Sequence, residues 1–89
     1  MTDNEIFAEA VATFGKKEQK IVAMEECSEL IQAISHELRG REHNIPEEIA
    51  DVEICLEQLK LMYCCAPEVE EIKQKKVRRL YDRICDKYF

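Results

Sequence analysis

Apolar residues recur along most of the chain at the three- and four-residue intervals of α-helices, and short breaks separate four such stretches. The first stretch covers about residues 3–14 and ends at Gly15, a residue typical of helix ends. The second covers about residues 17–38. Its larger apolar residues form one stripe, made of Met24, Cys27, Ile31, Ile34 and Leu38.

The third and fourth helices are predicted from their start signals and from the break between them. Asn44 predicts the N-cap of a third helix, and Pro46 follows where the first turn tolerates proline. This helix should reach about Cys64, and a fourth should run from Glu68 nearly to the end. With only two glycines and two prolines and short connections, the sequence predicts an all-α, single-domain bundle of about four helices over residues 1–89. The second and third helices should be antiparallel.

The charge and the cysteines narrow the class of protein. Nineteen acidic residues against 13 basic ones argue against a general nucleic-acid binder, which normally carries a basic surplus. We expect no membrane partner, because no apolar run approaches the roughly 20 residues that span a bilayer. The N-terminus has no secretory pattern, and the five cysteines are odd in number without a CxxC pair, so we expect a cytoplasmic protein with reduced cysteines rather than disulfides or zinc. Three of the five fall within helical apolar runs, where cysteine serves as a small apolar residue.

Several acidic residues of the second and third helices lie at positions where a carboxylate costs folding free energy. Glu48 falls in the middle of the apolar face of the third helix, and Asp51 falls at its edge one turn later. Burial of a carboxylate costs free energy unless it is paired or bound to a metal. On the second helix Glu25, Glu26 and Glu29 share one arc, where like charges repel by roughly 0.2–0.5 kcal/mol per pair. A solvated acidic face is the alternative for this arc. Together the two groups predict a site for Mg²⁺, which prefers oxygen ligands, with Mn²⁺ as the second candidate.

The fourth helix supplies positive charge. Lys73 and Lys76 project onto the same face as Val69, Ile72 and Leu80. Such lysines often lie along an apolar surface with the ammonium group in water. The alternative is that they contact an anion held by the carboxylate groups of the other two helices, an arrangement that suits phosphoryl chemistry.

These acidic residues also form a spaced motif. Glu25-Glu26-Cys27-Ser28-Glu29 is followed, after 18 residues, by Glu48-Ile49-Ala50-Asp51, which is the pattern EExxE, gap, ExxD. On this motif and its flanking segments the chain resembles the MazG-type all-α nucleoside triphosphate pyrophosphohydrolases, over about residues 15–83. The resemblance implies Mg²⁺-dependent hydrolysis of a nucleoside or deoxynucleoside triphosphate to a monophosphate and pyrophosphate, in nucleotide-pool housekeeping. It also implies a homodimer or homotetramer in which neighbouring subunits complete the site.

The resemblance carries roles to individual residues of this chain. Those roles are metal ligand for Glu26, Glu29, Glu48 and Asp51, general base or further ligand for Glu25, phosphate contact for Lys73 and Lys76, and base contact for Gln19.

Two other classes of protein compete with this interpretation. A non-catalytic helical dimerisation or adaptor module would have exposed, dispensable acidic residues, and Glu48 on an apolar face counts against it. A di-iron carboxylate bundle would use Glu-x-x-His pairs. Neither His36, preceded at i−3 by Ala33, nor His43, preceded by Gly40, belongs to such a pair.

Overall fold

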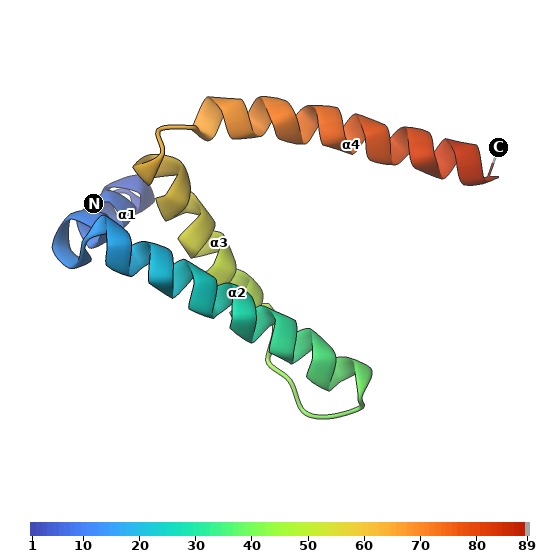
Figure 1. Cartoon of the computed structure of the whole chain (residues 1–89), viewed down its shortest axis with the longest axis horizontal. Coiled ribbons are helices and arrows are strands. Elements are labelled where there is room, and N and C mark those ends of the chain that lie inside the picture. Colours follow the sequence, from blue (N-terminus) through green and yellow to red (C-terminus); the bar gives the residue numbers. More distant parts are fainter. Residues whose placement is uncertain (89) are drawn as a thin grey trace.

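The computed structural model describes residues 1–88, and within them it contains four α-helices and no β-strand. The helices are α1 (Asp3–Phe14), α2 (Lys16–Leu38), α3 (Ile45–Met62) and α4 (Ala66–Tyr88), shown in Figure 1. The all-α prediction and the number of helices are therefore confirmed. None of these helices is both long enough and apolar enough to cross a bilayer.

The helix ends follow local chemistry. Thr2 and Glu5 form a capping box: the backbone N–H of Glu5 donates to Thr2 Oγ1 at 3.1 Å, and Glu5 Oε1 accepts from the N–H of Thr2 at 3.4 Å. Gly15 separates α1 from α2 with a φ of +95°, a value that glycine adopts without the steric cost of a Cβ.

Two predicted ends were wrong by two residues each. The third helix ends at Met62 rather than near Cys64, which has a φ of +50° and so leaves the right-handed helical region. The fourth helix begins at Ala66 rather than at Glu68, so Pro67 lies in its first turn. Proline is tolerated there because its missing N–H would have no partner within the helix.

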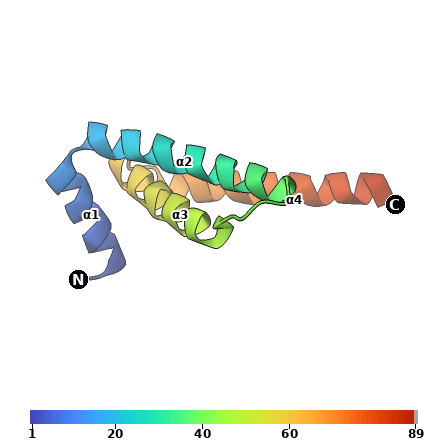
Figure 2. The same ribbon diagram turned by 90° about the horizontal axis from the view of Figure 1, so that it is seen from below.

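Helices α2 and α3 form an antiparallel hairpin, as predicted, and α1 is set at an angle across one end of it (Figures 1 and 2). The interior of this hairpin is made of small and polar residues. Among the described residues, those that are buried are Ala23, Ala33, Cys55, Gln19, Glu48 and Gln58. No large apolar side chain of residues 1–88 is fully buried, so a single chain has a thin hydrophobic core.

The predicted stripe of α2 is not the face that meets α3. Ile31 and Leu38 are 68% and 78% exposed, whereas Ala23 and Ala33 of the neighbouring face are buried. The small alanine side chains let the two helix backbones approach closely. The larger apolar residues are therefore left on the outside of the hairpin.

A matching stripe of α3 lies on the same side. Ile49, Leu56 and Tyr63 recur every seven residues and are all exposed. Lys20, one turn before Met24 on the same face of α2, places its Nζ 4.6 Å from the ring centroid of Tyr63, so the two stripes are neighbours. We call this surface the apolar side of the hairpin. It consists of Met24, Cys27, Ile31, Ile34 and Leu38 of α2 with Ile49, Leu56 and Tyr63 of α3.

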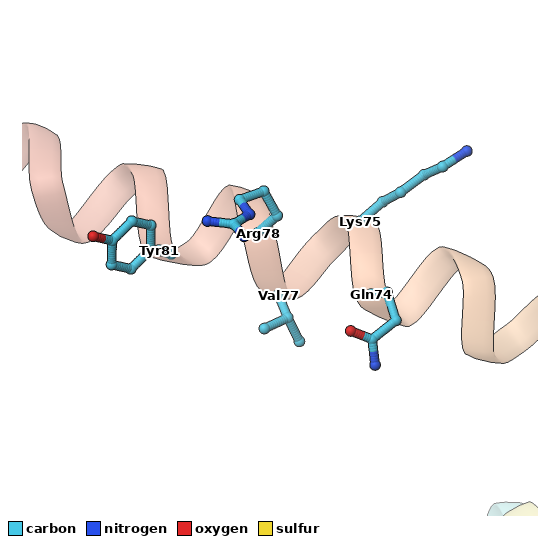
Figure 3. A pocket seen from close by; sticks show the side chains of 5 residues that line it. All are labelled: Gln74, Lys75, Val77, Arg78 and Tyr81. Atoms are coloured by element: carbon cyan, nitrogen blue, oxygen red, sulfur yellow. The ribbon is translucent and has the colours of Figure 1, made fainter.

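Helix α4 leaves the other three, and within residues 1–88 its backbone comes close only to that of α3, near the start of α4 (Figure 1). None of its residues is buried. The radius of gyration is 16.4 Å, against about 12 Å for a compact domain of this length. One hollow on α4 is lined by Gln74, Lys75, Val77, Arg78 and Tyr81 (Figure 3). All five come from one helix with no opposing wall, so the hollow is open surface and holds no site within this chain.

Candidate functional site

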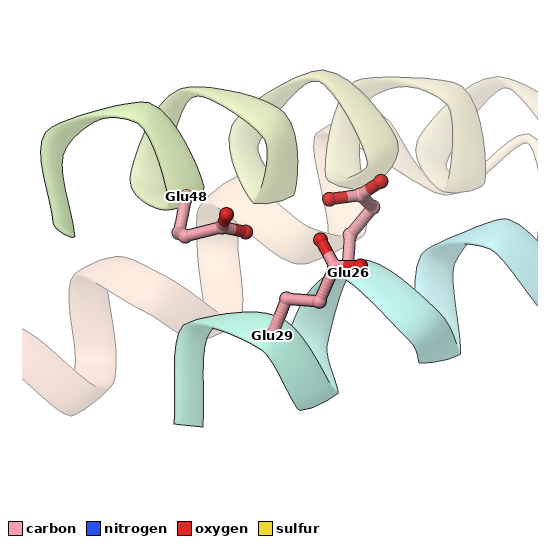
Figure 4. A group of neighbouring side chains, drawn as sticks. All are labelled: Glu26, Glu29 and Glu48. Atoms are coloured by element: carbon pink, nitrogen blue, oxygen red, sulfur yellow. The ribbon is translucent and has the colours of Figure 1, made fainter. Parts of the chain in front are cut away.

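Three of the predicted metal ligands meet between α2 and α3. Glu26 and Glu29 extend from α2 toward Glu48 of α3 (Figure 4). One carboxylate oxygen from each lies within 4.8 Å of the other two. Residues nineteen or more positions apart in the sequence are therefore brought together by the antiparallel hairpin, as the spacing of the motif predicts.

Glu48 is the most confined of the three. It is only 6% exposed, and its position on the inward face of α3 confirms the prediction from the helical projection. Its Oε1 accepts a hydrogen bond from Asn44 Nδ2 at 2.8 Å. Asn44 stands at the N-cap position of α3, but its side chain does not cap the helix; it orients Glu48 instead. The second oxygen, Oε2, is buried with no hydrogen-bond partner among the described residues.

Glu26 has the electrostatic signature of crowded carboxylates. Its Oε2 is also buried without a hydrogen-bond partner in residues 1–88. Burial raises the pKa of Glu26 above its ordinary value, and the negative charges of Glu29, Asp51 and Glu48 raise it further. Each cause disfavours the charged form. The site therefore concentrates negative charge, and no basic side chain of residues 1–88 lowers the pKa of Glu26.

The other two acidic candidates lie at the edge of this group. Asp51 is half-buried, and its charge acts on Glu26, but it is outside the group of three whose oxygens come within 4.8 Å. Glu25 is exposed and also outside that group. The structure thus brings Glu26, Glu29 and Glu48 together, with Asp51 adjacent and Glu25 on the solvent side.

A hollow of about 150 Å³ adjoins the carboxylates. It is lined by Gln19, Val22 and Glu26 of α2 and by Asp51, Ile54, Cys55 and Gln58 of α3. At its far end Gln19 Nε2 donates to Gln58 Oε1 at 2.7 Å, and both side chains are more than nine-tenths buried. Gln19, predicted as a base contact, is therefore an interior residue beside the acidic group.

Gln58 was missed by the sequence reasoning. The signal was available, because Gln58 follows Asp51 by seven residues and Cys55 by three, and so shares their inward face. A polar residue at an inward helical position needs a partner, as Glu48 does. The projection of the third helix drew attention to charged residues and passed over an uncharged amide.

The two lysines are not brought to the carboxylates within one chain. Lys73 lies at the start of α4 and lines a groove with Phe7 and Ile54, together with other residues of α1 and α3. Lys76 shares an exposed face of α4 with Ile72 and Leu80, which confirms the predicted face. Neither lysine contributes to the pKa of Glu26. Their predicted role requires a second chain.

The donor set fits a hard divalent cation. Three carboxylates with two unpartnered buried oxygens offer the oxygen ligands that Mg²⁺ and Mn²⁺ take, and no histidine or thiol belongs to the group of three. Comparisons with protein-family models, with curated proteins and with solved structures found no match to this chain. The case for a function therefore rests on the geometry of the site.

Proposed function

We propose that this chain is a Mg²⁺-dependent nucleoside triphosphate pyrophosphohydrolase of the MazG type, producing a nucleoside monophosphate and pyrophosphate. The observation that carries the proposal is the buried carboxylate of Glu48, whose free oxygen stands beside Glu26 and Glu29 of the facing helix. The three glutamates match the acidic motif in the sequence, and the hydrogen bond from Asn44 satisfies only one of the two oxygens of Glu48.

The cost of this arrangement supports a bound cation. Leaving a buried polar group unsatisfied costs about 1–3 kcal/mol, and more when the group is charged. Two such oxygens occur here, in a chain whose interior holds no large buried apolar side chain in residues 1–88. A divalent cation coordinated by Glu26, Glu29 and Glu48 would relieve the repulsion, and Asp51, which lies outside this group of three but whose charge acts on Glu26, would hold it through water.

The remaining residues have distinct roles in the proposed reaction. Glu26, Glu29 and Glu48 would hold the metal, which would supply positive charge to shield the polyphosphate and polarise the phosphoryl oxygens. Glu25, exposed beside the group of three, takes a proton from the attacking water or acts as a further ligand. The polar lining at Gln19 and Gln58 orients the nucleoside. Attack at the α phosphorus releases pyrophosphate.

The proposal includes a homodimer or homotetramer. The α2 stripe follows the alternating three- and four-residue spacing by which helices of a bundle interlock, and the α3 stripe follows the seven-residue repeat that is the sum of the two. The chain exposes 7273 Å², against about 5,400 Å² for a compact monomer of its mass. The surplus is large compared with the roughly 800 Å² that each partner buries in a standard interface. Packing of the apolar side of the hairpin on that of a second copy would cover part of this surplus, and the extended α4 helix contributes the rest.

Assembly also supplies the missing positive charge. Helix α4 extends from the rest of its own chain, with Lys73, Lys76 and Arg79 on its exposed surface. In a dimer or tetramer such a helix is free to lie against another copy. We propose that the phosphate contacts of each site come from the α4 helix of another copy.

A direct assay tests the activity. The purified chain is incubated with each NTP and dNTP and Mg²⁺, and pyrophosphate and orthophosphate are scored separately. We expect pyrophosphate, loss of turnover in Glu29→Ala and Asp51→Ala, and unchanged turnover in Glu53→Gln, an exposed acid of α3. In ¹⁸O-labelled water the label should enter the monophosphate. Label only in pyrophosphate, or release of orthophosphate alone, would contradict the proposal.

The second candidate is a non-catalytic dimerisation module, and the exposed apolar side of the hairpin is the observation that favours it. This candidate predicts dimerisation with no hydrolysis of any triphosphate. It also predicts that Mg²⁺ leaves the melting temperature unchanged, since no site would be completed by the ion.

A further inference from the structure

Two adjacent cysteines form the junction between α3 and α4. Cys64 is exposed, Cys65 is half-buried, and both are free thiols. Helix α4 leaves the hairpin at this junction (Figure 1), and none of its residues is buried. Because so little else in residues 1–88 holds α4, the backbone conformation of the two cysteines sets the direction of the helix.

Cys64 occupies a position that glycine usually fills. Its backbone N–H donates to Leu61 O at 3.2 Å, and the N–H of Cys65 donates to Lys60 O at 3.1 Å. These two bonds are those of a Schellman motif, with Cys64 at the C′ position after Tyr63, the C-cap of α3. Cys64 has a φ of +50°, the one positive value among the non-glycine residues of 1–88. A side chain in this conformation costs free energy that glycine avoids.

Cys65 is also unusual for its position. It precedes Ala66, the first residue of α4, and its carbonyl accepts from the N–H of Val69 at 2.9 Å. Cys65 is therefore the N-cap of α4, where serine, threonine, aspartate or asparagine supplies a side-chain oxygen to the first turn. Local helix chemistry thus favours neither cysteine. What two adjacent thiols can do, and the residues usual at these positions cannot, is reversible oxidation to a disulfide.

The surroundings of the pair suit exchange with another disulfide. The pKa of Lys60 is raised chiefly by its hydrogen bond to Glu57, and a negative charge on Cys65 adds to the rise, so Lys60 and Cys65 are neighbours. Nearby positive charge and partial exposure are typical of cysteines that react in this way. Intracellular disulfides are usually transient and redox-sensing, which agrees with a pair that is reduced in this structure.

We propose that Cys64 and Cys65 are a site of reversible oxidation, and that the oxidant is a low-molecular-weight disulfide such as oxidised glutathione. The exposed Cys64 thiolate attacks the disulfide, which releases one small thiol and leaves a mixed disulfide on Cys64. Cys65 then attacks Cys64 Sγ, so that the Cys64–Cys65 bond forms and the second small thiol leaves. The two protein thiols give up two protons and two electrons, and these reduce the oxidant to two thiols.

Closure of this ring changes the shape of the junction. Cα atoms of adjacent residues are about 3.8 Å apart across a trans peptide, whereas disulfides usually join Cα atoms about 4.4–6.8 Å apart. The bond is therefore strained and easily reduced, as a reversible switch requires. Closure must alter the backbone of Cys64 and Cys65, whose N–H groups make the bonds to the end of α3. Oxidation thus turns α4 together with Lys73 and Lys76. Its effect on turnover rests on the proposed function, in which these lysines contact the phosphates.

Tryptic mapping of the full-length protein tests the bond. Trypsin releases residues 61–73 as one peptide, which contains Cys64 and Cys65 and no other cysteine. The protein is equilibrated with mixtures of reduced and oxidised glutathione and then alkylated. We expect the oxidised peptide to lack two hydrogen atoms and to resist alkylation until dithiothreitol is added. A stable mixed disulfide with glutathione, a disulfide between chains, or free thiols at every ratio would overturn the proposal.

Hydrogen exchange tests the movement of the junction. Oxidation should speed exchange of the Cys64 and Cys65 amides at least fivefold, because their bonds to α3 are lost. Cys64→Gly suits the left-handed position and removes the attacking thiol, so it should melt no lower than the wild type and should not respond to oxidised glutathione. Cys85→Ser, which removes a thiol far along α4, is the matched control and should respond as the wild type does. A disulfide that leaves exchange unchanged would overturn the claimed turning of α4.

Triphosphate turnover separates this inference from the proposed function. Oxidation should lower turnover of the wild type at least fivefold, dithiothreitol should restore it, and Cys64→Gly should keep its turnover in oxidised glutathione. If the Cys64–Cys65 bond forms and no triphosphate is cleaved in either state, the proposed function is wrong and the oxidation site stands. If pyrophosphate is released at one rate in every glutathione mixture and no bond forms, the inference is wrong and the proposed function stands.

Discussion

Replacement of Glu48 by glutamine should make the protein more stable than the wild type in a chelator and less stable than the wild type in Mg²⁺. The amide keeps an oxygen to accept from Asn44 Nδ2, the 2.8 Å bond that Glu48 Oε1 makes now. It removes the charge from a side chain that is 6% exposed. Its new N–H groups point into a space bounded by the carboxylates of Glu26 and Glu29, which can accept them. In the absence of metal the variant should therefore be the more stable protein.

The magnitudes follow from the buried oxygen and from ligand linkage. The unpartnered Oε2 of Glu48 costs the apo wild type about 1–3 kcal/mol, and Glu48→Gln should recover about the lower figure. For a chain of this size 1 kcal/mol corresponds to roughly 4–8 °C in melting temperature. With Mg²⁺ at a hundred times its dissociation constant, the wild type should gain about 2.7 kcal/mol. The variant, lacking the innermost ligand, should gain little.

Thermal unfolding followed by circular dichroism, in EDTA and in a Mg²⁺ series, measures both effects at a fixed protein concentration. Glu53→Gln makes the same chemical change on the outer surface of α3 and should follow the wild type in both conditions. Equal responses of wild type and Glu48→Gln to Mg²⁺ would refute the role of Glu48 as a ligand. A Glu48→Gln protein that melts below the wild type in EDTA would refute the claimed cost of the apo site.

Three further predictions use the same protein. In EDTA the free energy of unfolding should fall as the pH rises from 4.5, the ordinary pKa of Glu26, to its raised pKa in the folded state, because the folded state keeps the proton to higher pH. Glu26→Gln should make the melting temperature less dependent on pH over this range. Light scattering should give at least twice the 10.5 kDa chain mass, and Leu56→Asp on the apolar side of the hairpin should yield monomer. Lys73→Gln and Lys76→Gln should raise KM for the triphosphate more than the Mg²⁺ requirement, whereas Lys75→Gln, whose lysine pairs with Glu71 on α4, should change neither in steady-state assays.

Helical periodicity predicted the position of Glu48 because that position depends on one helix alone. The inward positions of α3 repeat with the helical period, whichever helix packs against them. The four helices were predictable for the same reason, and Gly15 marked the break between the first two. The two-residue errors near Cys64 and Pro67 arose where a left-handed residue and a first-turn proline, rather than periodicity, set the helix ends.

The inward face of α2 was not predictable in this way. The most apolar stripe of a helix is normally its buried face, and here Ile31 and Leu38 lie outside while Ala23 and Ala33 lie within. A sequence contains no mark that separates an apolar stripe used within a chain from one used between chains. The Gln19–Gln58 pair was unpredictable for a related reason, since two polar residues become partners only when the hairpin register is known.

The polar interior of the hairpin and its apolar exterior have one physical explanation. A two-helix interface that holds Gln19, Glu48 and Gln58 gains little from apolar burial, and its carboxylates repel. Such an interface needs stabilisation from outside itself. The stripes on the apolar side of the hairpin can supply it if a second copy covers them, because each buried Leu or Ile contributes roughly 1.5–3 kcal/mol. The proposed assembly thus lets the hairpin interior stay polar and open enough to bind a metal and a base.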